Sequence, residues 1–258
     1  MKTVMDMRVA SCDKISPLYA LMRLTPTAGA LPDGILPGQF VQVAIPQSKS
    51  TFLRRPISVC FTDYVSGELW LLVRNAGEGT NALINSNSGD AYSIILPLGN
   101  GFTIPADNRK KMLLVGGGVG VAPLLYLGSE MQKQGFDVHF ALGARSAADL
   151  LLLTEFEKYG TVHVSTEDGS MGEKGFITQH SVFSTDIDCI ACCGPTPMMK
   201  AVAKIAKSKS IECEVSLENL MACGLGACLC CVEDTVRGNV CVCTDGPVFN
   251  INDLKWEL

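Results

Sequence analysis

A chain of 258 residues exceeds one typical domain and is long enough for two domains, each with its own core. Its formal net charge of −5 and pI near 5.3 argue against nucleic acid as a partner, because no basic run could neutralise phosphates. The hydrophobic fraction is 47%, yet no apolar stretch reaches the roughly 18 residues of a membrane helix. We therefore expect the apolar residues in a core or in a protein interface.

Residues 1–104 have the pattern of short β-strands separated by turns. One helical turn is expected at Thr80–Asn85, with Thr80 as its cap. The even spacing of the strands, without a long helix, predicts a small antiparallel β-barrel. The runs with alternating or β-rich character are Met5–Ala10, Tyr19–Leu24, Phe40–Ile45, Ile57–Thr62, Glu68–Val73 and Tyr92–Leu96.

Two segments of this barrel carry groups suited to a diphosphate ligand. In the first, Arg54-Arg55-Pro56-Ile57-Ser58, a guanidinium beside a proline-fixed strand start can form a bidentate pair, and the serine hydroxyl can reach a nearby ring. In the second, Leu72-Val73-Arg74 leads into Gly77-Glu78-Gly79-Thr80, a turn whose backbone amides can face a phosphate. Each segment alone is weak evidence, since such turns and strand edges commonly bind nothing. Their occurrence in one barrel is more persuasive.

The pattern changes after Pro105-Ala106-Asp107-Asn108, a polar linker marked by proline. The apolar run Lys111–Val115 is typical of a buried parallel strand, and a glycine-rich turn and a helix at Leu124–Gln134 follow it. The alternation beyond it predicts a doubly wound parallel α/β sheet with its ligand at the carboxyl ends of the strands. Further strands are expected at Asp137–Leu142, Thr161–Ser165 and Asp188–Cys192, and further helices at Leu150–Tyr159, Phe176–Phe183 and Met198–Lys207.

Six of the twelve cysteines lie between Leu220 and Val248. Cys223, Cys228 and Cys231 form a C-x4-C-x2-C run, which is plant-type [2Fe–2S] spacing, and Cys243 can close it after eleven intervening residues. Small residues fill the tight part of the run, which suits a loop whose backbone amides point at sulfur. The two remaining cysteines, Cys230 and Cys241, could in principle replace a neighbouring ligand.

Zinc and disulfides are the alternatives for these cysteines. A zinc site usually presents two C-x2-C pairs, whereas here one half is C-x4-C-x2-C and the other offers Cys241 and Cys243 with one residue between. The segment Met1–Ser11 has no apolar run of signal length, so we expect a cytoplasmic chain with reduced thiols. The three histidines show no triad-like setting and are expected to have packing roles. They are His139, His163 and His180.

The segments RRPIS, VRNAGEGT, GGGVGVAP and CCGPTPMM resemble the ferredoxin-NADP reductase superfamily, in which an FAD barrel precedes a nicotinamide-nucleotide domain. The tail from Ser216 through MACGLGAC to VCTDGPVF is similar to the electron-transfer subunit of class 1B dihydroorotate dehydrogenase. This resemblance runs essentially end to end. It implies an oxidoreductase subunit that holds FAD and a [2Fe–2S] cluster and docks on an FMN-bearing catalytic subunit as a heterotetramer. Its electrons would pass from dihydroorotate to NAD+ in pyrimidine biosynthesis.

The resemblance also implies the domains and the roles of single residues, with no residue in a catalytic role. Residues 1–104 form the FAD-binding barrel, 105–212 the NAD-binding α/β domain and 213–258 the cluster segment of an α+β multidomain chain. The loop between the third and fourth ligands looks short for the family, and the DGPVF after Cys243 favours this residue over Cys241. The implied positions are Arg55, Pro56, Ile57, Ser58, Leu72, Val73, Arg74, Gly79 and Thr80 for FAD, Gly116, Gly117, Gly118, Gly120, Cys193, Gly194 and Pro195 for the nucleotide, and Cys223, Cys228, Cys231 and Cys243 for the cluster.

Two alternatives stay open at this point. The same layout resembles the small subunit of an NADH-dependent ferredoxin:NADP+ transhydrogenase or of a sulfide dehydrogenase complex. A non-enzyme alternative is a zinc-bearing interaction module with a degenerate flavin barrel, which would lack visible absorbance. For the nucleotide we expect NAD(H) over NADP(H), because Arg145 has Asp149 close by and the acids Glu167 and Asp168 would repel a 2′-phosphate.

Overall fold

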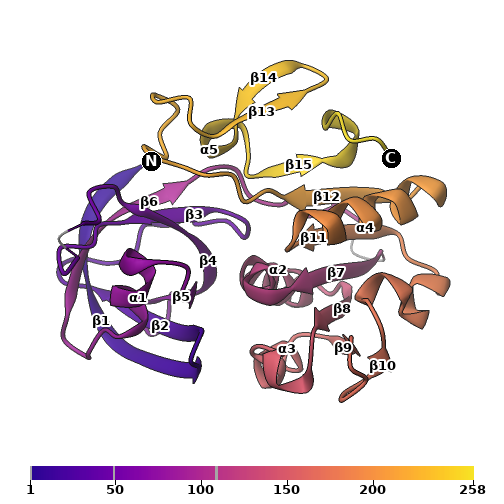
Figure 1. The fold of residues 1–258 in the computed structure, drawn as a ribbon, viewed down its shortest axis with the longest axis horizontal. Helices are drawn as coiled ribbons and strands as arrows, with labels where there is room; N and C mark the ends of the chain where they lie inside the picture. The colour runs from indigo at the N-terminus through magenta and orange to yellow at the C-terminus, as the bar shows by residue number, and fades with distance from the viewer. Residues whose placement is uncertain (1, 49, 108–109) are drawn as a thin grey trace. The chain divides into compact units, whose positions relative to one another are not determined.

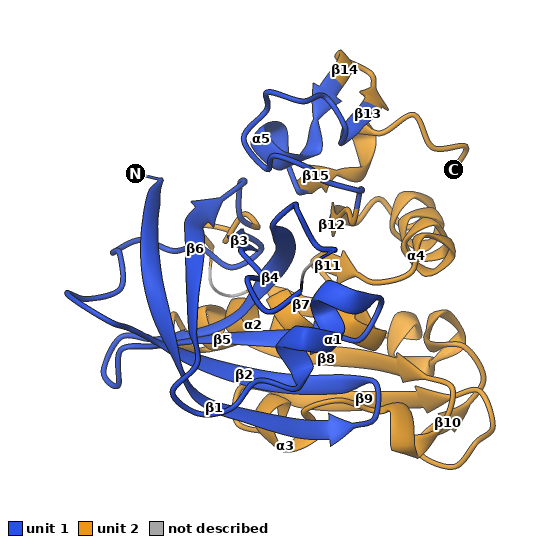
Figure 2. Ribbon diagram, turned by 60° about the vertical axis from the view of Figure 1, so that its left-hand side comes forward, with its two compact units in different colours: residues 1–101, 219–233, 240–247 blue, residues 102–218, 234–239, 248–258 orange. Residues whose placement is uncertain are grey.

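The computed structural model describes residues 2–48, 50–107 and 110–258 (Figure 1). The chain divides into two compact units, drawn in blue and orange in Figure 2. Unit 1 comprises residues 1–101, 219–233 and 240–247, and unit 2 comprises 102–218, 234–239 and 248–258. The predicted cluster segment 213–258 is thus shared between the units, and the linker residue Asn108 lies outside the described residues. No helix among the described residues has the length and apolar character needed to cross a membrane.

Unit 1 contains a closed antiparallel barrel with the strand order β1-β2-β5-β4-β3-β6. Every strand expected from the alternating pattern is present, so the barrel prediction is confirmed. Apolar side chains such as Leu24, Leu69 and Ile94 are fully buried and fill its core. The strands are β1 (Thr3–Ser16), β2 (Tyr19–Pro26), β3 (Phe40–Val43), β4 (Arg55–Asp63), β5 (Glu68–Arg74) and β6 (Ala91–Leu98).

The helix after β5 begins earlier than expected. Helix α1 spans Glu78–Ile84 with Gly77 at its N-cap, so the prediction of Thr80 as the cap is wrong. The Thr80 hydroxyl accepts the N–H of Ala76 at 2.8 Å and donates to the Gly77 carbonyl at 3.0 Å inside the first turn. Glu78 stabilises the earlier start, because its carboxylate accepts from the Ser48 hydroxyl at 2.8 Å and lies near the positive end of the helix.

Unit 2 contains a sheet with the order β10-β9-β8-β7-β11-β12-β15. All pairs are parallel except that of β12 with β15. The chain runs outward from β7 through β8 and β9, and then returns to the other side of β7 for β11 and β12, which confirms the doubly wound prediction. The strands are β7 (Lys111–Gly117), β8 (Asp137–Ala144), β9 (Thr161–Thr166), β10 (Glu173–Lys174), β11 (Cys189–Cys193), β12 (Glu212–Ser216) and β15 (Val248–Asn250).

Two predicted helices of unit 2 are confirmed and two are not. Helices α2 (Ala122–Lys133) and α4 (Thr196–Ser208) lie where the sequence predicts them. The prediction for Leu150–Tyr159 is wrong in extent, because α3 spans only Leu153–Phe156 after a residue, Leu152, in the left-handed conformation with φ 57°.

The helix predicted at Phe176–Phe183 is wrong. The segment forms two 3-10 turns, η3 (Ile177–Gln179) and η4 (Ser181–Ser184), with an extended His180 between them. The imidazole explains the break, because His180 Nδ1 accepts the N–H of Val182 at 2.9 Å and so caps the second turn. This local hydrogen bond competes with a continuous helix.

The remaining part of the chain is a ribbon with short turns. Strands β13 (Val232–Thr235) and β14 (Gly238–Cys241) pair with each other, and α5 (Val242–Asp245) follows directly. The turn before α2 is η1 (Gly118–Val121), and two further turns are η2 (Ala147–Asp149) and η5 (Ile251–Asp253).

Candidate functional site

Strands β4 and β5 separate at the part of the barrel that carries the predicted flavin segments. Among the described residues, β4 pairs with β5 from Val59 to Asp63, and residues 55–58 pair with β3 alone. On β5, residues 72–74 pair with β2 and not with β4. We call the opening between residues 55–58 of β4 and 72–74 of β5 the seam. Backbone groups that face the seam are not used in a β4–β5 ladder and can therefore contact a ligand.

The two flavin segments lie against each other at one end of the seam. A Cβ added to Gly79 would lie 3.0 Å from Arg55 Nε and 2.9 Å from Thr51 Cγ2, so any other residue at this position would have to displace these side chains. Arg55 donates to the Leu53 carbonyl at 3.3 Å. Arg54 instead donates to the Ser93 hydroxyl on β6 at 3.0 Å. The structure thus gives the two adjacent arginines different tasks, and Arg55 is the one placed beside the turn.

The other residues predicted for the flavin differ in what they can offer. Pro56, Ile57 and Ser58 are half-buried along the seam, and Arg74 is exposed at the end of β5. Leu72 and Val73 have side chains that are at most 1% exposed in the barrel core. Only the main chain of these two residues can contact a ligand.

In unit 2 the two predicted nucleotide turns lie side by side. Cys193 and Gly116 are register partners at the carboxyl ends of β11 and β7. A Cβ on Gly120 would lie 2.5 Å from Gly194 Cα and 2.6 Å from the Cys193 oxygen, so the backbones touch directly. The structure therefore brings Gly116, Gly117, Gly118 and Gly120 together with Cys193, Gly194 and Pro195, as a bound pyrophosphate would require.

The Cys193 side chain is a packing group. It is 1% exposed, and burial raises the pKa of its thiol well above the ordinary value. The thiol is therefore protonated, which leaves the main chain of Cys193 as the part that faces the turn.

All four predicted cluster ligands lie in unit 1, on a loop whose thiols accept backbone N–H groups. The N–H of Leu225 lies 3.3 Å from Cys223 Sγ, and the N–H of Gly226 lies 3.1 Å from Cys243 Sγ. The N–H of Cys243 itself lies 3.4 Å from Cys231 Sγ. Such donors stabilise anionic sulfur, so the residues present fit a cluster held by thiolates.

Two of these thiols show opposite pKa shifts. The pKa of Cys223 is lowered to about 6, because the N–H of Leu225 donates to its sulfur. Burial beside Cys231 raises the pKa of Cys243 to about 12. Metal binding would have to displace the proton from Cys243, while Cys223 offers a thiolate near neutral pH.

The cysteines outside the predicted set are not equivalent. Cys230 is exposed, whereas Cys241 is half-buried, and burial together with the neighbouring Cys231 raises the pKa of the Cys241 thiol. In the described part of the chain, no three Cys, His, Asp or Glu side chains converge on the position of one ion. A [2Fe–2S] cluster distributes its four cysteines over two irons.

The three histidines, which have no shared motif in the sequence, come together on the sheet of unit 2. His139 Nδ1 lies 2.9 Å from His163 Nε2, and the His180 ring packs edge-on against His163 with centroids 5.4 Å apart. Asp137 and Glu173 lie at the two ends of the group, 3.1 Å and 3.5 Å from ring nitrogens. Burial lowers the pKa of His163, so this ring is neutral at pH 7. The sequence carries no signal of this grouping, in which the three rings pack against one another.

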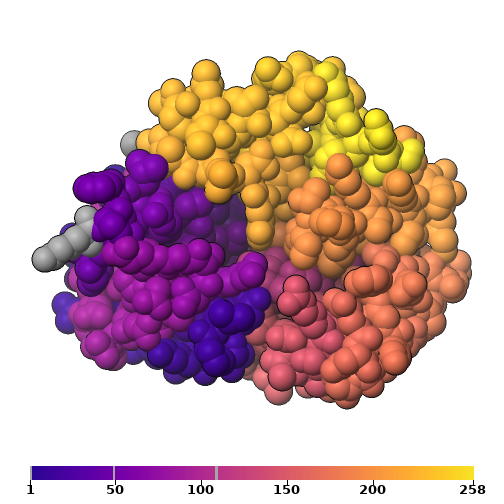
Figure 3. Space-filling view, in the orientation of Figure 1, coloured from indigo at the N-terminus to yellow at the C-terminus, as the bar shows by residue number. Residues whose placement is uncertain are grey.

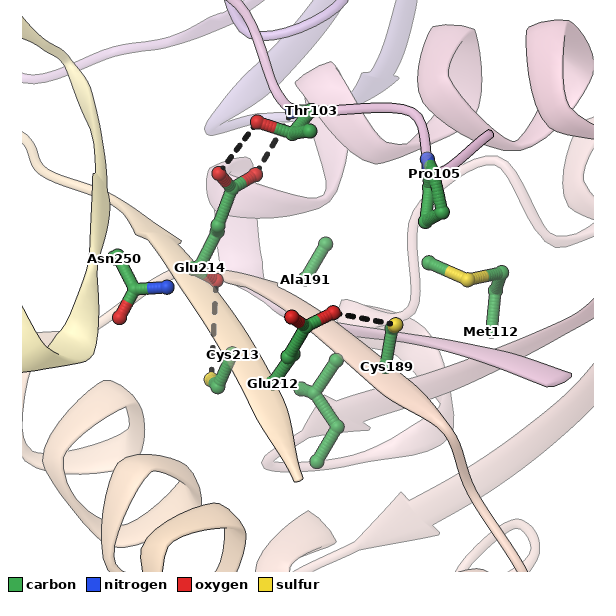
Figure 4. A pocket seen from close by; sticks show the side chains of 10 residues that line it. Thr103, Pro105, Met112, Cys189, Ala191, Glu212, Cys213, Glu214 and Asn250 are labelled. Carbon is green, nitrogen blue, oxygen red and sulfur yellow. Dashed lines mark hydrogen bonds between the residues drawn. The ribbon is translucent and has the colours of Figure 1, made fainter. Parts of the chain in front are cut away.

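Unit 2 also has a cavity of about 220 Å³ at the amino ends of its strands, where Met112, Cys189 and Glu212 lie (Figure 4). Glu214 closes one side, because its carboxylate accepts the N–H and the hydroxyl of Thr103 at 2.8 and 2.7 Å. This cavity is distinct from the glycine turns, which lie at the carboxyl ends of the same strands.

The barrel with its open seam, the doubly wound sheet with its glycine turns and the cysteine loop define a flavin- and nicotinamide-dependent electron transferase of the ferredoxin reductase type. Residues 218–255 match the iron-sulfur cluster binding domain of dihydroorotate dehydrogenase B, and residues 114–204 match the oxidoreductase NAD-binding domain. The chain belongs to the family of dihydroorotate dehydrogenase B (NAD(+)) electron transfer subunits. It is 40% identical to the Shouchella clausii subunit, with 84% of this chain and 86% of the relative covered.

Further relatives agree with this assignment. The Listeria monocytogenes electron transfer subunit is 40% identical, covering 86% of this chain and 88% of its own. A chain of the NADH-dependent reduced ferredoxin-NADP oxidoreductase has a TM-score of 0.85 at 28% identity, covering 97% and 90% of the two chains. The ferredoxin reductase of carbazole 1,9a-dioxygenase shares the fold, with a TM-score of 0.70 at 20% identity, over 81% of this chain and 67% of that one. The higher identity favours the dihydroorotate dehydrogenase relationship over the transhydrogenase alternative.

Proposed function

We propose that this chain passes electrons from a dihydroorotate-oxidising subunit, through a [2Fe–2S] cluster and FAD, to NAD+ in pyrimidine biosynthesis in the cytoplasm. The observation that carries the proposal is the presence of a cysteine loop, a flavin seam and paired glycine turns on one chain of this family. When bound, FAD supplies the conversion between one-electron carriers and a two-electron hydride acceptor.

On the flavin side, Arg55 would hold the diphosphate through charge-assisted hydrogen bonds, supported by the backbone of Gly79 and Thr80. The Ser58 hydroxyl and the backbone of residues 55–58 and 72–74 would orient the ring along the seam. These residues bind and position, and none of them needs to move a proton.

Arg55→Ala is expected to purify folded but with partly depleted FAD. Losing a charged bidentate partner costs about 1.5–3 kcal/mol, which is a factor of ten or more in affinity. FAD content per chain and its dissociation constant are the measurements, and Arg8→Ala, an exposed arginine on β1, is the matched control. Unchanged FAD affinity in Arg55→Ala would remove Arg55 from the site.

On the nucleotide side, the turns at Gly116–Gly120 and Cys193–Pro195 would receive the pyrophosphate. NAD and NADP would be distinguished at the turns that follow β8 and β9, which carry Arg145 and Asp168. The backbone N–H of Asp168 donates to the Arg145 carbonyl at 3.2 Å, which brings the turns after β8 and β9 together. Asp168 has a lowered pKa because Ser170 donates to its carboxylate, so it stays anionic beside the single arginine. This balance of charge supports NAD(H) over NADP(H).

On the cluster side, we propose Cys223, Cys228, Cys231 and Cys243 as the ligands, with the DGPVF sequence after Cys243 as the reason to prefer it to Cys241. The backbone amides of Leu225 and Gly226 would donate to the ligating sulfurs. Such donors set the potential at which the cluster accepts an electron.

The partner would be an FMN-bearing catalytic subunit, assembled as two copies of each chain. Three leucines of the cluster segment are exposed, Leu220 at 85%, Leu225 at 45% and Leu229 at 64%. Figure 3 shows this segment, in the golden part of the colour scale, on the molecular surface. Exposed apolar side chains beside a redox loop suit a surface that a partner covers.

The isolated chain should oxidise NADH with an artificial acceptor, yet fail to reduce NAD+ with dihydroorotate. The reason is that we propose no general base in this chain that could remove a proton from a carbon atom of dihydroorotate. Adding the catalytic subunit should restore dihydroorotate-dependent reduction of NAD+, with NADP+ a much poorer acceptor. Reduction of NAD+ by dihydroorotate with the isolated chain would refute the division of labour, and activity with a different large subunit alone would favour the transhydrogenase type.

A further inference from the structure

A buried glutamine, Gln42, stands out in unit 1. Its side chain is 0% exposed, and within the described residues neither its Nε2 nor its Oε1 has a hydrogen-bond partner. An amide that is cut off from water without a partner destabilises a fold, and natural cores rarely keep one. A glutamine at such a position indicates a partner that is not part of the polypeptide.

The outer face of β3 shows where this amide points. Phe40 and Gln42 alternate with Val41 and Val43, so the first two share one face of the strand. Phe40 lies near the cluster segment, because a Cβ added to Gly99 would be 3.0 Å from Phe40 Cε1 and 2.6 Å from Pro247 Cδ. The face of β3 that carries Phe40 and Gln42 is therefore the face nearest the cysteine segment.

Gln42 touches the cysteine loop itself. A Cβ added to Gly224 would lie 2.6 Å from Gln42 Nε2 and 3.1 Å from its Cδ, so the amide rests against the residue that follows Cys223. Gly224 has φ +69°, a conformation that suits glycine, and its missing side chain leaves the amide in contact with the loop backbone. Both features bring the donor close to the first cysteine of the C-x4-C-x2-C run.

The same residue is next to the flavin strand. Gln42 is the register partner of Pro56 on β4, and its carbonyl accepts from Arg54 at 3.3 Å. The backbone of Gln42 is thus fixed by the strand that carries the flavin segment, while its side chain reaches the cysteine loop. A substitution of this side chain can therefore change the environment of the cluster without moving Arg55.

We propose that the Gln42 amide donates a hydrogen bond to a sulfur atom of the [2Fe–2S] cluster and raises its reduction potential. The proposal rests on the proposed function, because it needs a cluster on Cys223 and its partners. Sulfur ligands become more electron-rich on reduction, so a donor stabilises the reduced state more than the oxidised one. The donor comes from a barrel strand and not from the cysteine segment, so it lies outside the ligand motif.

The test compares Gln42→Leu with the wild-type holoprotein. We expect the cluster to be retained with a shifted EPR spectrum and a midpoint potential lowered by about 59 mV, the equivalent of a tenfold change for one electron. Gln42→Glu, which keeps the shape but replaces the Nε2 donor with an acceptor, should shift the potential in the same direction. If Gln42→Leu folds poorly, Gln42→Glu still tests the proposal.

Gln39→Leu is the matched control. The Gln39 amide already has partners in the chain, the Gly99 carbonyl at 2.8 Å and the Leu36 N–H at 2.8 Å, so its loss should leave the cluster spectrum and potential unchanged. An unchanged potential and spectrum in both Gln42 variants would overturn the proposal, as would a shift confined to the FAD. A wild-type chain without iron and sulfide would instead refute the cluster on which the proposal rests.

Discussion

Cys223→Ser and Cys228→Ser are each expected to remove the [2Fe–2S] cluster and to leave FAD in place. Four-cysteine ligation implies about two irons and two sulfides per chain, and loss of one thiolate leaves an iron without its full ligand set. Iron and sulfide content should fall toward zero together with the EPR signal. NADH-to-dye activity should persist, because the flavin seam and the glycine turns use other residues.

Cys230→Ser and Cys241→Ser provide the comparison within the same segment. Cys230 is exposed, and its replacement should leave the cluster intact. Cys241 is the stricter control, because it lies beside Cys231 as Cys243 does. A full cluster in Cys243→Ser, combined with its loss in Cys241→Ser, would transfer the fourth position to Cys241.

Gly120→Ala is expected to abolish most nucleotide-dependent activity. The added Cβ would lie 2.5 Å from Gly194 Cα and 2.6 Å from the Cys193 oxygen, and neither backbone atom can rotate away as a side chain would. The two turns must separate, at a cost of about 1–3 kcal/mol. A displacement of about 1 Å at a binding turn can lower a rate roughly 100-fold.

The measurements are the NADH-to-dye rate, the NADH dissociation constant and the FAD content, which should stay unchanged. Val119→Ala is the control in the same turn, since it removes atoms and adds none to the contact with Gly194. Wild-type NADH affinity in Gly120→Ala would show that the nucleotide does not depend on the contact between these turns.

The parts of the fold that depend on local pattern could be predicted from the sequence. Alternation located the barrel strands, and apolar runs followed by glycine located the edge of the parallel sheet. The helix predicted at Phe176–Phe183 failed because the His180 side chain caps a second turn, a choice that periodicity does not record. A similar limit applies to α3, where a left-handed Leu152 shortens an apparently helical run.

The candidate site could be predicted only as separate pieces. The sequence identified Arg55, the glycine turns and the cysteine spacing, each by residue type and separation. It carried no signal that Gly79 lies against Arg55, that Gly120 touches Gly194, or that Gln42 lies under Gly224. These close contacts depend on strand register and on packing between residues far apart in the chain. A short stretch of sequence contains neither kind of information.

The antiparallel pairing of β12 with β15 has a consequence for how the cysteine loop is prepared for iron. Ser216 is opposite Val248, so the chain leaves the edge of the sheet, carries all four proposed ligands and returns to the same edge. The ends of this excursion are joined by main-chain hydrogen bonds, and the entropy of closing the loop is therefore lost when the sheet forms. The ends of the segment are therefore already fixed when iron binds. The free energy of iron binding then has to order the four thiols, and it does not also have to close the loop.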